Sequence, residues 1–65
     1  MDLADVIKQA KDKEVYKATF AIKEHWYITK ESGFIWYCAE DGKIFDDERA
    51  VPLTYSNLRA DYELT

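Results

Sequence analysis

The chain has 65 residues, enough for one domain over residues 1–65 and close to the smallest size that folds alone. Its net charge is −4, which argues against general binding to a nucleic-acid backbone. The longest apolar run, 34–39, is too short to cross a membrane, and the single cysteine excludes an internal disulfide. We therefore expect a protein of a reducing cytoplasm, free of membrane and nucleic acid, that gains further burial by oligomerisation.

The first expected element is a helix over about residues 2–12, packed on a sheet. Asp2 is placed to cap this helix, and Asp5 lies near the positive end of its dipole. The spacing i, i+3, i+4, i+7 defines one apolar face, which carries Leu3, Val6, Ile7 and Ala10.

Two strands are expected next. Residues 14–22 alternate in character, and one face of this strand carries Tyr16, Ala18, Phe20 and Ile22. A turn at 23–24 precedes a short strand over 25–29. A second turn is predicted over 30–33, because Gly33 can take a positive φ.

A hairpin is predicted over residues 34–45. Asp41-Gly42 is typical of a two-residue type I′ turn, which would pair Glu40 with Lys43, Ala39 with Ile44, and Cys38 with Phe45. Both faces of its first arm, 34–39, are apolar, whereas a strand exposed to water on one face would alternate with polar residues. So short a chain has little to cover both faces, and this predicts a homo-oligomer.

The C-terminal third begins with a charged loop over 46–49. Thr54 is the expected cap of a short helical turn over 55–60, and 61–64 is expected to form a brief terminal strand or an extended tail. The predicted fold class is α+β: an N-terminal helix packed on a small antiparallel meander sheet of SH3-like or open-barrel form, then a short C-terminal helical turn and a tail strand.

Residues able to support catalysis are few. His25 and Cys38 are the only ordinary base and thiol, and a cysteine between large aromatic residues usually acts as a small hydrophobe. The acidic residues of 46–48 lack the spacing of a calcium loop, and the two glycines form no phosphate-binding loop. We expect no enzyme activity, no metal and no cofactor.

A binding site is the better-supported expectation. Aromatic residues recur on neighbouring strands, with cations close in sequence, and this combination suits a nucleobase stacked beside a phosphate. The aromatic residues are Phe20, Trp26, Tyr27, Trp36 and Tyr37, and the cations are Lys17, Lys23 and Arg59. The alternative is that these aromatic residues form the core or a subunit interface.

Four segments of the chain resemble segments of a known protein family, and they occur in the same order. They are the helix spacing of 3–10, the strand segment Val15, Lys17 and Phe20, the hairpin segment 39–44, and the closing segment 58–64 with Thr54 as its helix cap. Together they resemble the small phage-encoded Thoeris anti-defence sponge family, the second type described. In this chain Lys17 stands in place of the family's Arg, and Phe20 and Tyr62 stand in place of Trp.

The resemblance implies a non-enzymatic phage protein that acts in the host cell cytoplasm. Such sponges form symmetric oligomers and trap cyclic nucleotide immune signals, of the cyclic ADP-ribose type or cyclic oligonucleotides, between subunits. Lys17 would then hold phosphate, Phe20 or Trp36 would stack on adenine, and Arg59 would close the pocket. Trp26 and Asp61 complete the expected ligand-binding set.

Two other functions fit the same residues. One is a small acidic phage protein that inhibits a host protein by direct binding, through loop 46–49 and an exposed sheet face. The other is a structural or assembly module without a ligand.

Overall fold

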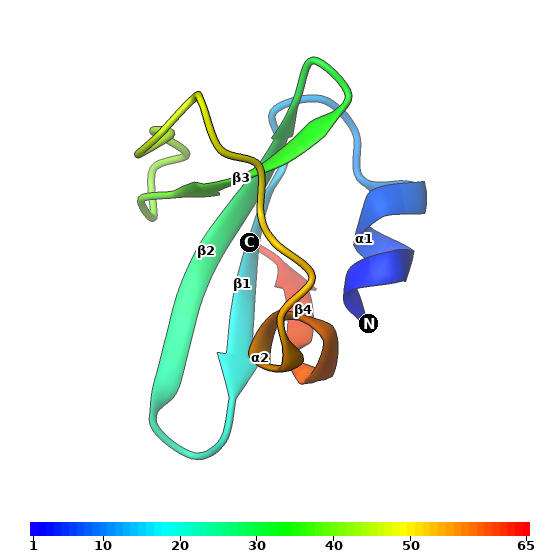
Figure 1. Cartoon of the computed structure of the whole chain (residues 1–65), viewed down its shortest axis with the longest axis vertical. Helices are drawn as coiled ribbons and strands as arrows, with labels where there is room; N and C mark the ends of the chain where they lie inside the picture. Colours follow the sequence, from blue (N-terminus) through cyan, green and yellow to red (C-terminus); the bar gives the residue numbers. More distant parts are fainter.

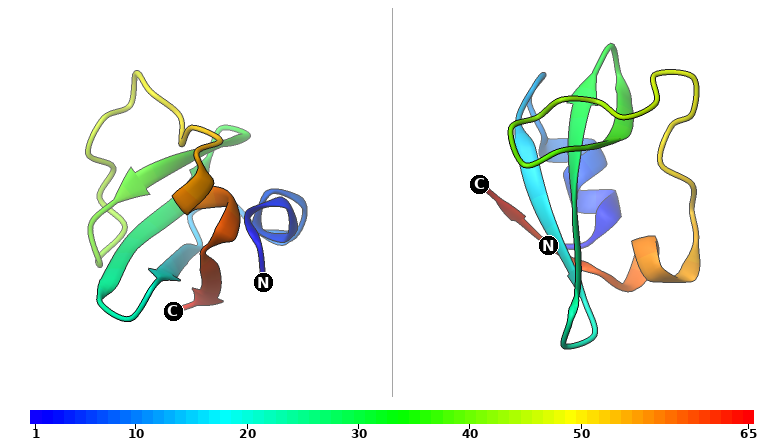
Figure 2. Two further views of the ribbon diagram at one scale, coloured as in Figure 1. Left: turned by 60° about the horizontal axis from the view of Figure 1, so that its bottom comes forward. Right: turned by 90° about the vertical axis from the view of Figure 1, so that its left-hand side faces the viewer.

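The computed structural model describes all 65 residues and contains four antiparallel strands and two helices (Figure 1). In chain order the elements are α1 (Leu3–Gln9), β1 (Val15–Phe20), β2 (Glu24–Glu31), β3 (Phe34–Cys38), α2 (Tyr55–Arg59) and β4 (Asp61–Leu64). The strands lie in the order β3-β2-β1-β4, and both helices lie on one side of them (Figure 2). The predicted α+β class is confirmed. No helix is long and apolar enough to span a bilayer.

Helix α1 begins where the sequence predicts and ends earlier. The Asp5 N–H donates to the Asp2 carboxylate at 2.9 Å, and the Asp2 N–H faces the Asp5 carboxylate at 3.4 Å, which forms a capping box. The prediction of a helix to residue 12 is wrong, because Ala10 is already extended and Lys13 takes a φ of 67°. Leu3, Val6 and Ala10 are buried as expected, whereas Ile7 stays 46 % exposed.

The sheet register places one set of alternating side chains against the helices. Tyr16 pairs with Ile28, Ile28 pairs with Tyr37, and Ala18 pairs with Tyr62, so these side chains share a face. The buried core on this face consists of Leu3, Val6, Ala10, Tyr16, Ala18, Ile28, Ile35, Ala60 and Tyr62. The tail segment is therefore a true sheet strand, β4, held against β1.

The two turns of the meander differ from the prediction in position. Strand β1 ends at Phe20, and the turn that follows includes Ala21 at a φ of 57° and Ile22, which is 97 % exposed. Ile22 was expected on the apolar face of the strand, and that expectation is wrong. At the next turn, Ser32 and Gly33 both have positive φ and join the paired residues Glu31 and Phe34.

The predicted hairpin at Asp41-Gly42 is wrong by one residue in register. Cys38 bridges to Ile44, the Ala39 N–H donates to the Lys43 carbonyl at 2.8 Å, and the Gly42 N–H donates to the Ala39 carbonyl at 2.9 Å. Only Gly42 has positive φ, at 93°, so the loop is a type I turn closed by glycine and not a type I′ turn. The expected pairs Glu40–Lys43, Ala39–Ile44 and Cys38–Phe45 are not formed. The second arm is reduced to a single bridge.

The far face of the sheet is covered only in part. Cys38 and Thr29 are buried there, and the loop after β3 folds over it until Gly42 lies against the side chain of Val15. Phe34, at the other end of β3, is 57 % exposed. We expected both faces of strand 34–39 to be covered. A single chain covers both faces only at the C-terminal end of this strand.

Candidate functional site

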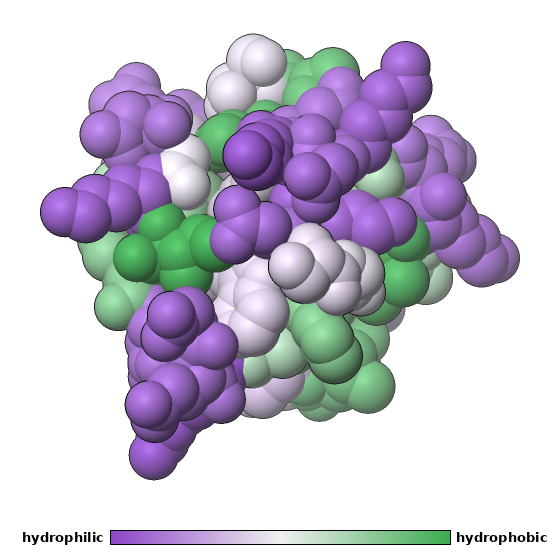
Figure 3. Space-filling model, turned by 90° about the horizontal axis from the view of Figure 1, so that it is seen from above, coloured by the Kyte–Doolittle hydropathy of each residue, from purple (hydrophilic) through white to green (hydrophobic).

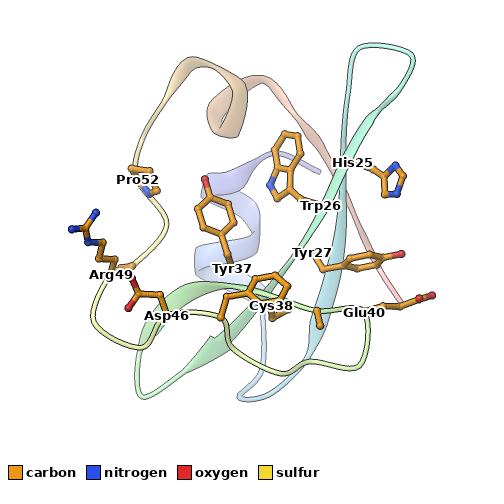
Figure 4. A pocket seen from close by; sticks show the side chains of 12 residues that line it. His25, Trp26, Tyr27, Tyr37, Cys38, Glu40, Asp46, Arg49 and Pro52 are labelled. Atoms are coloured by element: carbon orange, nitrogen blue, oxygen red, sulfur yellow. The ribbon is translucent and has the colours of Figure 1, made fainter.

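A groove lies along the stretch of β2 that β3 leaves uncovered, and we call it the aromatic groove (Figure 4). It consists of two adjoining hollows of about 940 and 450 Å³, which share His25, Trp26 and Tyr37. The larger hollow is also lined by Tyr27, Cys38, Ala39, Glu40, Phe45, Asp46, Arg49, Ala50 and Pro52. The smaller one is also lined by Lys23, Glu24, Thr54, Ser56 and Asn57.

The groove exists because β3 is shorter than β2. Tyr27 and Cys38 form the last pair between the two strands. The same register would place Glu40 opposite His25, but the chain turns away at Ala39. The first residues of β2, 24–26, are thus paired with β1 on one side and open on the other.

Aromatic side chains stand on both faces of the sheet at this open edge. Trp26 pairs with Ala18 and Tyr37 pairs with Ile28, so both lie on the core face. His25 and Tyr27 lie on the other face, where their rings meet edge to face at 6.5 Å. Figure 4 shows these two pairs on opposite sides of β2. A flat ligand at the edge of the sheet would therefore have an aromatic surface above and below it.

Hydrogen bonds from Asn57 fix one wall of the groove. Its side-chain amide donates to the Tyr37 hydroxyl at 2.7 Å and to the Pro52 carbonyl at 2.8 Å. The Tyr62 hydroxyl donates to the Asn57 carbonyl at 2.7 Å. Burial, with a smaller contribution from the nearby Tyr37, raises the pKa of Tyr62 to about 12. These bonds hold Tyr37 at a set position.

One polar atom beneath the groove lacks a partner. The indole N–H of Trp26 is buried and makes no hydrogen bond. Burial of an unbonded N–H costs stability, so Trp26 is held there by its packing.

The charged groups at the groove are not paired with one another. Arg49 lines the larger hollow and Lys23 the smaller one, and both are exposed. The single ion pair of the chain joins the Met1 ammonium to Asp61 at 2.9 Å, far from these cations in the sequence. Arg49 and Lys23 therefore have no ion-pair partner, although Glu40 and Asp46 line the larger hollow and Glu24 lines the smaller one.

The His25 and Cys38 side chains both line the groove, yet they do not form a nucleophilic pair. Cys38 is 2 % exposed, and burial, with a smaller contribution from Asp41, raises its pKa to about 11. A thiol with this pKa is protonated near neutral pH and is a poor nucleophile. No three His, Cys, Asp or Glu side chains gather in a way that could hold a metal ion.

Of the six residues predicted to bind the ligand, Trp26 lines the aromatic groove. Lys17 is exposed on the far face, where it pairs with Tyr27 from the neighbouring strand. Phe20 packs edge to face on Tyr55 at 5.8 Å on the core face, so Lys17 and Phe20 lie on opposite faces of the sheet.

The other three lie elsewhere in the chain. The Trp36 indole N–H donates to the Glu31 carbonyl at 2.9 Å, and its ring lies against Phe34. Arg59 is exposed at the end of α2, and Asp61 is paired with Met1. A single chain therefore does not gather the predicted set into one pocket.

The groove also contains residues outside the predicted set. Tyr27, Tyr37 and Lys23 belong to the aromatic and cationic grouping seen in the sequence, but Arg49 and His25 were not expected to bind ligand. Loop 46–49 was expected to be a charged loop, and no local pattern shows that Asp46 and Arg49 line the groove across from β2. In comparisons with protein-family models, curated proteins and solved structures, nothing matches this chain.

Proposed function

We propose that this protein is a non-enzymatic phage anti-defence sponge that captures a cyclic nucleotide immune signal at the aromatic groove. The observation that carries the proposal is the pair of aromatic surfaces on opposite faces of an open sheet edge, beside unpaired cations. Such surfaces suit a stacked base, and Arg49 suits a phosphate because its guanidinium can bind two oxygens at once. A volume of about 940 Å³ is within the usual range for small-ligand sites.

A second subunit would complete this site. Apolar side chains are exposed between charged ones at the end of the molecule that carries the β2–β3 turn (Figure 3). Ile7, Phe34 and Leu53 line one hollow next to the β2–β3 turn and are 46, 57 and 70 % exposed, and we call them the apolar patch. Association through this patch would bury apolar surface that a lone chain leaves in water. In a symmetric oligomer, Lys17 or Arg59 of one subunit would meet a ligand held by another.

Calorimetry and thermal shift against cyclised ADP-ribose and cyclic dinucleotides test the proposal. A nucleotide that binds only the native state raises Tm. Arg49→Ala should weaken its binding by about 1.5–3 kcal/mol, the worth of a hydrogen bond to a charged group. Lys8→Ala, on the exposed side of α1, is the matched control and should bind normally.

The same titrations locate the ligand. If Lys17→Ala and Arg59→Ala also weaken binding, the nucleotide lies between subunits. If only Arg49→Ala does so, it lies within one chain. The proposal fails if no cyclic nucleotide of the panel binds.

A second candidate function is inhibition of a host protein by direct binding. It is favoured by the apolar patch, which surrounds a hollow of about 180 Å³ on an acidic protein. A Phe34→Ser variant would then lose its host target while an Arg49→Ala variant kept it. A protein of this kind would bind no nucleotide.

A further inference from the structure

We infer that the main chain of His25 reads the hydrogen-bonding edge of the captured base. This inference rests on the proposed function and narrows its ligand class. The ligand would be a nucleotide whose base offers a donor and an acceptor side by side, as an adenine does through its 6-amino group and an unsubstituted N1.

Backbone groups of successive residues in an antiparallel strand point to alternate sides. The Lys30 carbonyl accepts from the Lys13 N–H, at 2.6 Å, on the β1 side of β2. The Val15 carbonyl accepts from the Thr65 N–H at 3.0 Å, on the β4 side of β1. The backbone groups of Val15 therefore point away from Thr29, its partner on β2. Both observations give one result: the odd-numbered residues of β2, His25 among them, direct their N–H and C=O groups away from β1.

The backbone groups of β3 point in the directions that this assignment requires. The carbonyls of Ile35 and Tyr37 accept from the N–H groups of Val51 and Phe45, at 2.8 and 3.1 Å, on the outer edge of β3. The alternate residues of β3, including Cys38, therefore face β2, and Cys38 meets Tyr27 in the last pair.

His25 is the next residue of β2 that faces this side, and it has no opposite strand. Glu40 would stand there if β3 continued, but it lies in the turn that begins at Ala39. No turn or loop residue bonds to the His25 N–H or C=O. One donor and one acceptor thus open together into the aromatic groove, which His25 lines.

This arrangement fits the edge of a base. The His25 N–H would donate to adenine N1, and its carbonyl would accept from the 6-amino group. The base would then extend the plane of the sheet, with Trp26 and Tyr37 over one face and Tyr27 over the other (Figure 4). An added peptide strand gains its affinity from several successive backbone pairs. Only one pair is open here, which favours a base.

A proline substitution tests the donor directly. His25→Pro removes the N–H, and proline is tolerated in a strand where that N–H bonds to no neighbour. His25→Ala keeps the N–H and is the matched control. We expect His25→Pro to bind cyclic di-AMP, or an ADP-ribose cyclised through its riboses, about tenfold more weakly, since one neutral hydrogen bond is lost. His25→Ala loses the ring and keeps the N–H, so His25→Pro should also bind about tenfold more weakly than His25→Ala. Circular dichroism checks that both variants fold.

A change in the probe gives the same information without any variant. Methylation of adenine N1 blocks the acceptor, so the 1-methyladenine forms of both probes should bind the wild-type protein at least about tenfold more weakly. The His25 amide hydrogen should exchange fast in the free protein and slowly when cyclic di-AMP is bound.

The outcomes separate the inference from the proposed function. Equal binding of methylated and unmethylated probes overturns the inference and leaves nucleotide capture standing, and so does a folded His25→Pro variant that binds like wild type. A His25→Ala variant that loses as much affinity as His25→Pro would assign the recognition to the imidazole instead. If neither probe nor any other cyclic nucleotide binds, the proposed function itself is lost.

Discussion

The side-chain amide of Asn57 donates a hydrogen bond of 2.7 Å to the hydroxyl of Tyr37, which joins α2 to the wall of the aromatic groove. Asn57 is only 2 % exposed. A buried asparagine is costly unless its polar atoms are bonded, and this one also donates to Pro52. The bond sets the position of Tyr37 and ties the C-terminal helix to strand β3.

Asn57→Ala should therefore destabilise the fold. It removes both donated bonds and leaves the Pro52 carbonyl and the Tyr37 hydroxyl without this partner. We expect the free energy of unfolding to fall by about 1–3 kcal/mol, measured by urea denaturation. Ser56→Ala is the control, because the Ser56 side chain makes no hydrogen bond within the chain, and it should leave stability nearly unchanged. Equal stability of the two variants would contradict this role of Asn57.

Stability should fall at alkaline pH. Burial raises the pKa of Cys38 from 9.0 to about 11 and that of Tyr62 from 10.0 to about 12. Both groups are neutral when protonated, so the unfolded chain releases their protons first as the pH rises above 9. The folded state holds more protons in this range, and the free energy of unfolding must then decrease with pH.

Urea denaturation at pH values from about 8 to 11 measures this slope. A Tyr62→Phe variant lacks the tyrosine contribution and should show a shallower decline above pH 10 than wild type. It should also be less stable at neutral pH, because the Asn57 carbonyl loses its hydrogen bond. A wild-type stability that stays constant over the whole range would refute the prediction.

The two glycines should differ in their response to alanine. Gly33 and Gly42 both have positive φ, at 82° and 93°, so alanine is strained at either site. A Cβ on Gly42 would also lie 3.1 Å from Cγ2 of Val15, whereas a Cβ on Gly33 would meet no atom within 4 Å. Gly42→Ala should thus lower Tm more than Gly33→Ala. A reversed order would show that loop 39–43 does not rest on Val15.

Self-association is predicted from the apolar patch of Ile7, Phe34 and Leu53. Sedimentation equilibrium at micromolar concentration should show a dimer or a larger species, since large exposed apolar surfaces usually mark interaction sites. Leu53→Ser should shift the distribution toward monomer, and Ile22→Ser should not, because Ile22 lies in the β1–β2 turn, outside the patch. A wild-type monomer at these concentrations would argue against both the patch as an interface and a site completed by two subunits.

Local sequence patterns were enough to predict the helix caps and the first strand. The cap at Asp2, the cap at Thr54 and the alternation of Tyr16 and Ala18 depend on neighbours a few residues away, and the structure has each of them. The sequence also predicted that the aromatic residues Trp26, Tyr27 and Tyr37 lie on adjacent strands.

The arrangement of distant segments could be seen only in the three-dimensional structure. The pairing of β4 with β1, the one-residue shift at Cys38 and Ile44, and the position of Arg49 across the groove from β2 all depend on how distant segments are arranged. Local propensity does not encode them, because a shift of one residue changes every cross-strand partner while hardly changing the intrinsic preference of any residue. The aromatic groove exists because β3 stops at Cys38 while β2 extends past it, and the relative lengths of two paired strands are set by the packing of the whole sheet.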